Sequence, residues 1–357
     1  MSVSGSALRL ALAGLALAAC SGPAPSSSPP ALPVLTDQAS GTDALLIGSD
    51  AVSDDVVWLA GTGGTVVRTT DGGASWRATV IPGADTLQLR DIVALDAETA
   101  LALSIGTGAS SRIFKTTDGG ASWRTVFVNQ EPGGFFDCMD FWDDAHGLAF
   151  SDAVEDGFLI VTTADGGDTW QRVPPTALPA AADGEGSFAS SGTCVTTRGS
   201  GTAWIGTGNA SPARVLRTDD RGATWSAATA PVVSGEAAGL TSVVFRTDGV
   251  GVALGGDIAP SDSLAYAGAR STDGGRSWTE GGTLPFAGAV YGAAYVPGTD
   301  ALVAVGPGGA ALSYDDGRRW VLIDRRTFWG VTASSPEAIW MIGPDGRVVR
   351  ASLRHGD

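Results

Sequence analysis

The chain has 357 residues, of which 43% are apolar, 51 are glycine and only 17% are charged. So much glycine, with 11 tryptophans and no long amphipathic stretch, argues against a helical bundle and predicts short strands joined by tight turns. The formal charge of -16 would repel nucleic-acid phosphates, so we expect no nucleic-acid partner.

The N-terminus has the pattern of an export signal. Residues 10–19 form an apolar run that follows Arg9 and is too short to span a bilayer. The run ends in the sequence LAAC, at residues 17–20, which resembles the lipobox of bacterial lipoproteins. The resemblance implies that residues 1–19 are a signal peptide and that Cys20 is the lipidation site. An ordinary secretory signal is the alternative.

A lipid anchor predicts a tethered protein in the bacterial cell envelope. Residues 20–34 are rich in proline and serine, which is typical of a flexible tether. Ser21 after the cysteine is similar to the pattern of lipoproteins sent to the outer membrane of Gram-negative cells. We therefore expect contact with the membrane through the lipid alone, on the periplasmic side.

One phrase, Ser/Thr-x-Asp-x-Gly-x-x-Trp, occurs six times after residue 34. Its tryptophans recur about every 42 to 55 residues, which is the length of one four-stranded propeller blade. In each phrase the aspartate side chain can accept hydrogen bonds from a tight turn, and glycine allows a positive φ. The aspartates are Asp71, Asp118, Asp165, Asp220, Asp273 and Asp315, and the tryptophans are Trp76, Trp123, Trp170, Trp225, Trp278 and Trp320.

These phrases resemble the Asp-box, or BNR, repeat of sialidases, some other glycoside hydrolases, sortilin-type receptors and photosystem II assembly factors. The resemblance implies a β-propeller in which the aspartates and tryptophans are structural. Residues 338–343 and 347–350 repeat the strand phrases a seventh time without an Asp box. We therefore predict an all-β, seven-bladed β-propeller over residues 35–357, whose last blade is closed by a strand from residues 31–36 or just after.

The loops that precede each inner strand share one face of such a ring with the loops between the second and third strands, and we expect any ligand there. The candidate binding residues are Arg90, Phe136, Asp137, Asp152, Asp156, Glu185, Phe188, Asp257 and Tyr291. The longest loop, residues 174–193, carries the turn-prone acidic stretch 183–186. We interpret this loop as the insertion whose removal would best test a binding role.

Catalysis and cofactors have little support in the sequence. Four carboxylates, Asp152, Asp156, Glu185 and Asp257, could supply the acid pair of a glycosidase, but solvated loop acids are the simpler interpretation. The Arg-Ile-Pro signature of sialidases is absent near the N-terminus. With only His146 and His355, we expect neither a Ser-His-Asp triad nor a metal site, and no cofactor.

Two cysteines follow the predicted lipidation site. Cys138 and Cys194 occupy similar positions in successive repeats, so inner strands could bring them together. An oxidising compartment would then favour a disulfide. Two buried free thiols remain the alternative, because cysteine packs well as a small apolar residue.

The phrases between the boxes, at residues 135–137, 186–193 and 255–257, resemble those of bacterial relatives of photosystem II assembly and stability factors. That resemblance implies a monomeric, non-catalytic scaffold that binds a protein or peptide client. The acidity departs from the basic patch expected of such factors and indicates a different client. The alternative is a glycan-binding or sialidase-like hydrolytic propeller, with Phe136, Phe188, Tyr266 and Tyr291 as stacking residues.

Overall fold

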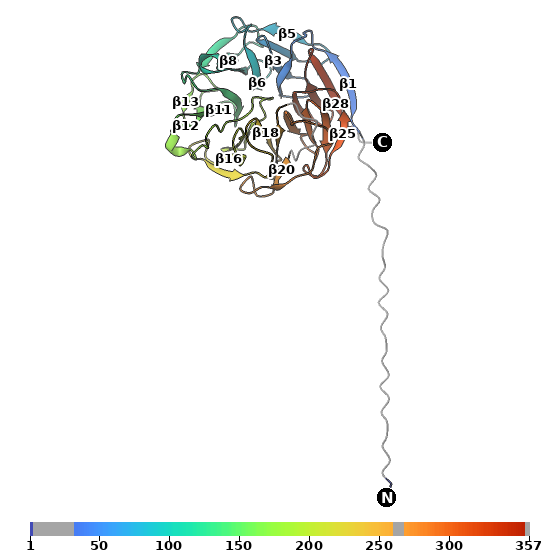
Figure 1. Cartoon of the computed structure of the whole chain (residues 1–357). Coiled ribbons are helices and arrows are strands. Elements are labelled where there is room, and N and C mark those ends of the chain that lie inside the picture. The colour runs from blue at the N-terminus through green and yellow to red at the C-terminus, as the bar shows by residue number, and fades with distance from the viewer. Residues whose placement is uncertain (3–31, 260–267, 354–357) are drawn as a thin grey trace. The chain divides into compact units, whose positions relative to one another are not determined.

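A computed structural model describes residues 1–2, 32–259 and 268–353. Its strands form seven four-stranded antiparallel sheets in a ring, seen along the ring axis in Figure 1. This confirms the predicted seven-bladed all-β propeller. The signal peptide, Cys20, most of the tether, Tyr266 and His355 lie outside the described residues.

Each blade is a sheet that runs outward from the ring axis. From the axis outward, blade 1 consists of β2 (Leu46–Ala51), β3 (Val57–Gly61), β4 (Thr65–Thr69) and β5 (Arg77–Val80), and blade 2 consists of β6 (Gln88–Ala94), β7 (Ala100–Ile105), β8 (Arg112–Thr116) and β9 (Arg124–Val128). In the same order, blade 3 consists of β10 (Phe136–Phe141), β11 (Gly147–Val154), β12 (Gly157–Thr163) and β13 (Gln171–Arg172), blade 4 of β14 (Val195–Arg198), β15 (Thr202–Gly206), β16 (Arg214–Thr218) and β17 (Ser226–Thr229), and blade 5 of β18 (Ala238–Phe245), β19 (Gly251–Asp257), β20 (Gly268–Ser271) and β21 (Thr279–Glu280). Blade 6 consists of β22 (Gly292–Tyr295), β23 (Leu302–Gly306), β24 (Gly309–Ser313) and β25 (Val321–Asp324), and blade 7 of β26 (Gly330–Ser335), β27 (Ala338–Ile342), β28 (Arg347–Ser352) and β1 (Val34–Ala39). Two 3-10 turns, η1 (Gly108–Ser110) and η2 (Pro175–Ala177), lie in the connections.

The hydrophobic core is divided among the blade interfaces. Strands such as β3 and β27 are buried at every residue, because a neighbouring blade covers each face of the sheet. One cluster of buried residues fills each interface, for example Trp58, Ile92 and Phe114 between blades 1 and 2. The outermost strands are largely exposed, as in β5 and β17. The ring therefore has no single centre of packing.

The N-terminal strand closes the ring. β1 pairs antiparallel with β28, from Val34 opposite Ser352 to Ala39 opposite Arg347, and lies at the outer rim of blade 7 (Figure 1). Trp76 of blade 1 donates from its indole nitrogen to Gln38 Oε1 of β1 at 3.0 Å. This is the three-plus-one closure predicted from the missing fourth strand.

Five of the six aspartate turns share one hydrogen-bond pattern, and in the sixth the guanidinium of Arg319 replaces the hydroxyl that donates to Oδ2. Thr69 Oγ1 and the Ser75 backbone N–H donate to Asp71 Oδ1 at 2.8 and 2.9 Å, and Ser75 Oγ donates to Oδ2 at 2.6 Å. These bonds, led by the Ser75 hydroxyl, lower the pKa of Asp71 to about 2. Since both carboxylate oxygens are used within the turn, these aspartates hold the turn together and are poorly placed for catalysis.

Candidate functional site

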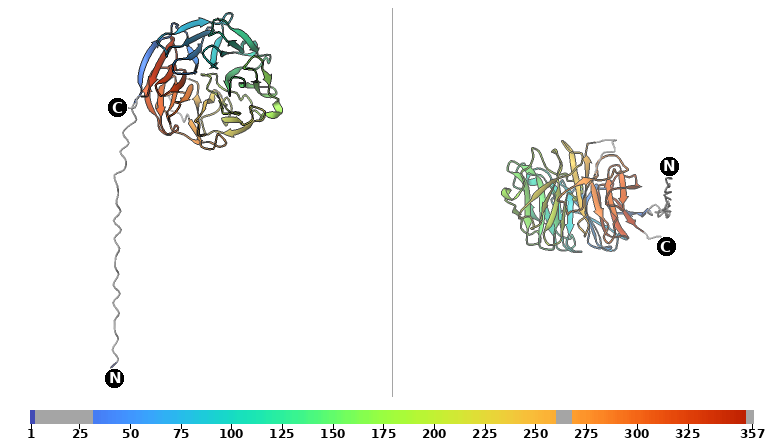
Figure 2. Two further views of the ribbon diagram at one scale, coloured as in Figure 1. Left: turned by 180° about the vertical axis from the view of Figure 1, so that it is seen from behind. Right: turned by 90° about the horizontal axis from the view of Figure 1, so that it is seen from below.

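The strands run between two faces of the ring, as the side view in Figure 2 shows. The aspartate turns join third to fourth strands on one face, here named the turn face. The loops into the inner strands and those between second and third strands lie on the other, here named the loop face. Arg90 and Asp137 lie on the first half of β6 and β10, and Tyr291 immediately precedes β22. All three are therefore near the mouth of the ring on the loop face.

The mouth of the ring is crossed by residues 186–193, which we name the plug segment. Arg90 Nη1 of blade 2 donates to the carbonyl of Ala189 at 3.0 Å. On the other side, Ser191 Oγ donates to the carbonyl of Tyr291 at 2.7 Å, just before blade 6. The segment thus connects blades on opposite sides of the axis and closes the channel toward the loop face.

Two further contacts fit the plug segment tightly into the channel. Thr193 Oγ1 lies 2.6 Å from Ser242 Oγ of blade 5. Gly192 has φ +85° and lies so close to Asp91 that a Cβ would be 2.1 Å from its Oδ1. These contacts correct the interpretation of residues 174–193 as a removable insertion, because deleting them would unplug the ring.

Beneath the plug segment lies a cavity of about 250 Å³, which we name the axial chamber. Three carboxylates from consecutive inner strands line it: Asp50, Asp91 and Asp140. Each accepts a backbone N–H from the inner strand of the next blade, from Ala94, Met139 and Thr197 respectively. Burial raises their pKa values to about 6, 7 and 7. These aspartates, absent from the sequence-based candidates, join blades 1 to 4.

An aromatic and cationic cluster surrounds the plug at the mouth. The Arg90 guanidinium lies 5.0 Å from the ring centroid of Trp329, and the Tyr291 ring is 4.8 Å from the same indole. Arg90, Tyr291 and Trp329 are each half-buried. This cluster is a partly exposed aromatic surface at the mouth of the ring. By contrast, Phe136 and Phe188 are buried, at 0% and 7% exposure, so they cannot serve as stacking platforms for a ligand.

Asp137 and Asp152 form a carboxyl pair below the plug segment. Asp137 is 1% exposed, and burial, followed by the neighbouring carboxyl of Asp152, raises its pKa well above the usual range. Burial also raises the pKa of Asp152 to about 6. Asp152 Oδ1 accepts the backbone N–H of Ser187 at 2.9 Å. The pair is therefore part of the support of the plug.

Glu185 is the second correction to the candidate site. It was expected to be a solvated loop acid, but it is 1% exposed and forms a bidentate ion pair with Arg214 of β16. Thr207 Oγ1 donates to the same carboxylate at 2.7 Å. The reason is that residues 180–185 fold back over blade 4. Asp156 is exposed, whereas Asp257 is half-buried and accepts the backbone N–H of Ala259.

In blade 3, a short hairpin joins the second and third strands. β11 extends to Val154 and β12 begins at Gly157, so Glu155 and Asp156 form the tip of a projecting hairpin. Between this tip and residues 180–184 lies a groove of about 870 Å³, which we name the acidic groove. Its lining includes Glu131, Pro132, Gly133, Ala153, Val154, Glu155, Asp156, Gly157, Ala180, Ala181, Ala182, Asp183 and Gly184.

A disulfide joins Cys138 and Cys194, with their Cα atoms 6.0 Å apart. It links β10 to the residue immediately before β14 and lies in the buried cluster between blades 3 and 4. The sequence left open whether these two cysteines pair. Their disulfide fixes the chain directly after the plug segment.

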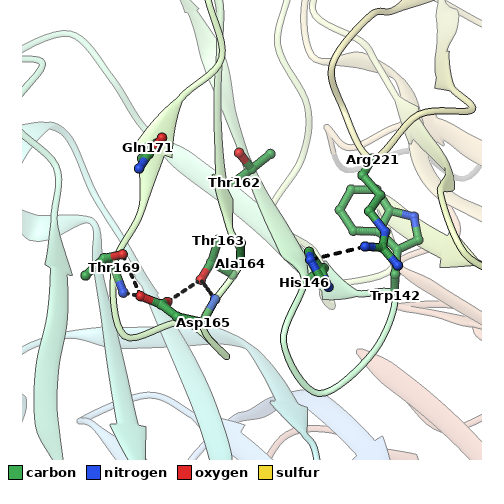
Figure 3. A pocket seen from close by; sticks show the side chains of 9 residues that line it. All are labelled: Trp142, His146, Thr162, Thr163, Ala164, Asp165, Thr169, Gln171 and Arg221. Atoms are coloured by element: carbon green, nitrogen blue, oxygen red, sulfur yellow. Dashed lines mark hydrogen bonds between the residues drawn. The ribbon is translucent and has the colours of Figure 1, made fainter.

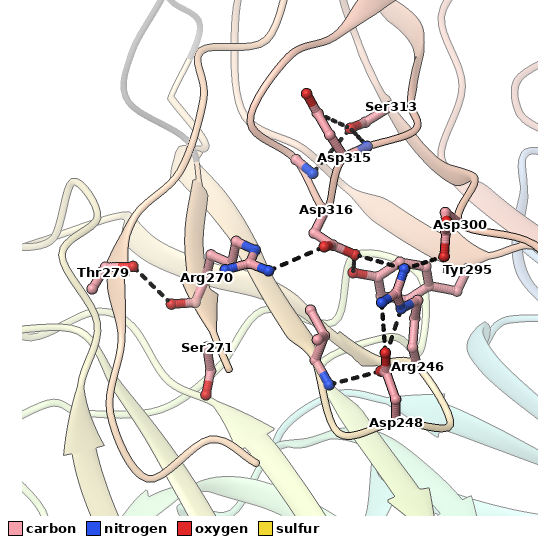
Figure 4. Close-up of polar contacts among 12 residues, drawn as sticks. Arg246, Asp248, Arg270, Ser271, Thr279, Tyr295, Asp300, Ser313, Asp315 and Asp316 are labelled. Atoms are coloured by element: carbon pink, nitrogen blue, oxygen red, sulfur yellow. Dashed lines mark hydrogen bonds and ion pairs between the residues drawn. The ribbon is translucent and has the colours of Figure 1, made fainter. Parts of the chain in front are cut away.

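The turn face carries ion-pair networks between blades. In Figure 3, a pocket of about 360 Å³ lies between the Asp165 turn and the side chains of Trp142, His146 and Arg221. In Figure 4, Asp316 forms ion pairs with Arg270 at 3.1 Å and with Arg246 at 3.3 Å. These charges are matched within the protein, which favours a structural role for this face.

The described residues contain no cluster of histidine, cysteine, aspartate and glutamate suited to a metal ion. In the same part of the chain, no helix is long and apolar enough to cross a membrane.

No protein-family model and no curated protein matches the chain. Among solved structures, it is similar to YCF48 bound to a D1 peptide, at 16% identity and a TM-score of 0.63, over 92% of this chain and 99% of that one. The likeness is one of fold. YCF48 from Cyanidioschyzon merolae gives 14% identity and a TM-score of 0.61, over 89% of this chain and 98% of that one. The GH74 xyloglucanase from Xanthomonas campestris gives 15% identity and a TM-score of 0.62, over 90% of this chain but only 54% of the enzyme.

Proposed function

We propose that this protein is a non-catalytic, lipid-anchored scaffold of the bacterial envelope that binds a protein or peptide client on the loop face. The acidic groove carries the proposal, because it is a large concave surface between a rigid hairpin and a loop that is fixed to blade 4. Its volume suits several residues of an extended chain. The YCF48 structure with a bound peptide supports peptide binding by a propeller of this form.

The charge of the groove indicates the chemistry of the client. Arg172 Nη1 pairs with Glu131 at 2.9 Å, and its Nη2 lies 4.0 Å from Asp156. Within the described residues, Glu155 and Asp183 form no ion pair and both are exposed. A client segment with lysine or arginine would complement these carboxylates and would be attracted by the overall charge of -16.

The anchor and the envelope location rest on the sequence at residues 17–20 and on the tether that follows. A lipid on Cys20 would hold the ring near a membrane surface while leaving the loop face free to meet a client. Acyl analysis of the purified protein by mass spectrometry tests this part of the proposal separately.

Hydrolysis of a glycan is the second candidate, since a GH74 enzyme shares the fold. Glycosidases place two carboxyl groups on opposite sides of an accessible sugar, at least about 5 Å apart. Here Asp137 is buried against Asp152, and Glu185 is held by Arg214. The candidate acids are therefore poorly arranged for this chemistry, which favours the scaffold.

The scaffold proposal is tested by crosslinking and capture of the full-length protein in its own envelope, followed by identification of bound partners. The test variant is Glu155→Gln/Asp156→Asn/Asp183→Asn. The control, Asp43→Asn/Asp85→Asn/Asp345→Asn, removes the same charge from exposed positions elsewhere on the loop face. We expect one reproducible client, lost from the groove variant and retained by the control.

Capture that is equal in both variants would rule out the groove as the docking surface. Turnover in a glycan screen, abolished by Asp137→Asn or Asp152→Asn, would instead establish the hydrolase.

A further inference from the structure

The carboxyl pair of Asp137 and Asp152 is in direct contact with the plug segment. This contact concerns a role separate from the proposed binding of a client. Gly186 lies so close to Asp152 that a Cβ would be 1.8 Å from Oδ1. Asp152 accepts the N–H of Ser187, and the backbone N–H of Ala189 hydrogen-bonds to Asp137. The backbone of residues 187 and 189 of the plug segment is thus bound to these two carboxyl groups.

The pair needs a proton to be stable in this position. Asp137 Oδ2 is fully buried and finds no donor among the described residues other than the carboxyl group of Asp152. Two carboxylates in contact and shielded from water repel each other strongly, so one of them keeps a proton. Burial raises both pKa values, but the contact between the two carboxyl groups raises the pKa of Asp137 further and lowers the pKa of Asp152, so the proton resides on Asp137.

Within the described residues, the two arginines near the plug segment already have other hydrogen-bond partners. Arg90 of β6 is engaged with Ala189, Gln88 and Trp329. Two further groups are near the plug. Arg214 is neutralised by Glu185, and Asp91 of β6 is a third buried acid that holds Met139.

The plug segment itself has no titratable side chain, since residues 186–193 read GSFASSGT. Its other anchors include hydrogen bonds from Arg90 to Ala189, from Ser191 to Tyr291 and between Thr193 and Ser242. Backbone bonds between Gly186 and Gly208 and a bond from Ser187 Oγ to the carbonyl of Gly206 also hold the segment. None of these bonds depends on a carboxyl group. The carboxyl groups that contact the plug segment are therefore the part of the support that responds directly to pH: the pair below residues 186–189, and Asp91 against Gly192.

We propose that the plug segment is a pH-sensitive lid over the axial chamber, held shut by the proton that Asp137 and Asp152 share. Loss of that proton leaves two buried negative charges beneath Gly186, Ser187 and Ala189. Both carboxylates belong to blade 3, so water reaches and stabilises them only when the plug segment moves away from that blade. The chamber, closed toward the loop face in the protonated state, then opens toward it.

The test is hydrogen–deuterium exchange of the full-length protein in short pulses from pH 7 to pH 10. The pulse length is scaled at each pH so that the intrinsic chemical exchange is constant. We expect protection of residues 186–193 to fall at least ten-fold across this range, while strands β3 and β27 keep their protection. A fall shared equally by all strands, or no fall, would overturn the proposal.

Asp137→Asn provides the decisive variant, because its amide N–H still donates to Asp152 but cannot ionise. We expect the plug segment of this variant to stay protected up to pH 10. Asp257→Asn, a half-buried carboxyl of blade 5 on the same face, is the matched control and should behave like the native protein. If Asp137→Asn does not fold, Asp152→Asn takes its place under the same criterion. A native-like loss of protection in the variant would refute the lid.

Discussion

Arg221 donates from Nη1 to Nε2 of His146 at 3.1 Å, and this contact joins the aspartate turn of blade 4 to the turn between β10 and β11 of blade 3 (Figure 3). Arg221 has φ +57°, a left-handed conformation that the turns of blades 1, 2, 3 and 5 fill with glycine. Asp316 of blade 6 has the same φ and likewise contacts the preceding blade, through Arg246 and Arg270. In both turns, an unfavourable backbone conformation is accompanied by contacts across an interface.

Replacing Arg221 separates the backbone cost from the contacts. Arg221→Ala keeps the left-handed backbone and loses the side chain, so we expect a loss of about 1–2 kcal/mol in the free energy of unfolding. Arg221→Gly loses the same contacts but relaxes the backbone, and should be about 1 kcal/mol more stable than the alanine variant. Urea unfolding of both variants measures the difference. Equal stabilities would show that the turn stores no backbone strain.

The disulfide should contribute strongly to stability. Cys138→Ala/Cys194→Ala frees a loop with a sequence separation of 56 residues, and we expect the free energy of unfolding to fall by about 2–4 kcal/mol. Chemical unfolding with and without reductant measures this. Reductant should lower the stability of the native protein and leave the double variant unchanged. If reductant did not change the unfolding of the native protein, the disulfide would make no contribution to the free energy of unfolding.

Removing one partner of the buried ion pair should be costly. Glu185→Ala leaves the guanidinium of Arg214 partly buried without its carboxylate, and we expect a loss of about 3–5 kcal/mol in the free energy of unfolding. Asp183→Ala is the control, since Asp183 lies two residues away and is exposed. Thermal unfolding compares the two variants. Similar small losses in both would mean that the ion pair is not needed to hold the loop.

Stability should pass through a maximum on the acid side of neutrality. The folded protein raises the pKa values of Asp50, Asp91 and Asp140 to about 6, 7 and 7, above the usual 3.8. Between pH 4 and 7 it therefore binds more protons than the unfolded chain, so stability falls as pH rises through this range. The opposite holds for Asp71 and Asp118, whose pKa values of about 2 make stability fall as pH drops from about 4 to 2.

Melting temperatures measured from pH 2 to pH 9 test this profile. We expect the highest value near pH 4 to 5 and a decrease that continues above pH 7, because the pKa of Asp137 is also raised well above its usual range. A melting temperature that climbs from pH 5 to pH 7.5 would contradict the assignment of buried, protonated aspartates to the ring axis.

The sequence was sufficient to predict the ring of blades but not the contacts at the ring axis. The repeated turn phrase specified six blades because its residues interact locally, as Asp71 does with Thr69 and Ser75. The plug segment depends on contacts such as Ser191 to Tyr291, which are 100 residues apart, and no local pattern reports them. Glu185 was misassigned for the same reason, because nothing in its neighbourhood indicates which arginine it meets.

The closing strand has a consequence for the synthesis of the protein. Ser40, directly after β1, donates to the carbonyl of Gly346, and the two residues are 306 positions apart. β1 is therefore among the first strands to leave the ribosome, yet its partner β28 is among the last. Until β28 has been synthesised, the nascent chain carries an unpaired strand, which is a template for mispairing with other chains. A chain that terminates before β28 would keep β1 unpaired permanently. A chaperone that shields the unpaired strand should therefore matter more for this protein than for a propeller whose last blade is built from consecutive strands.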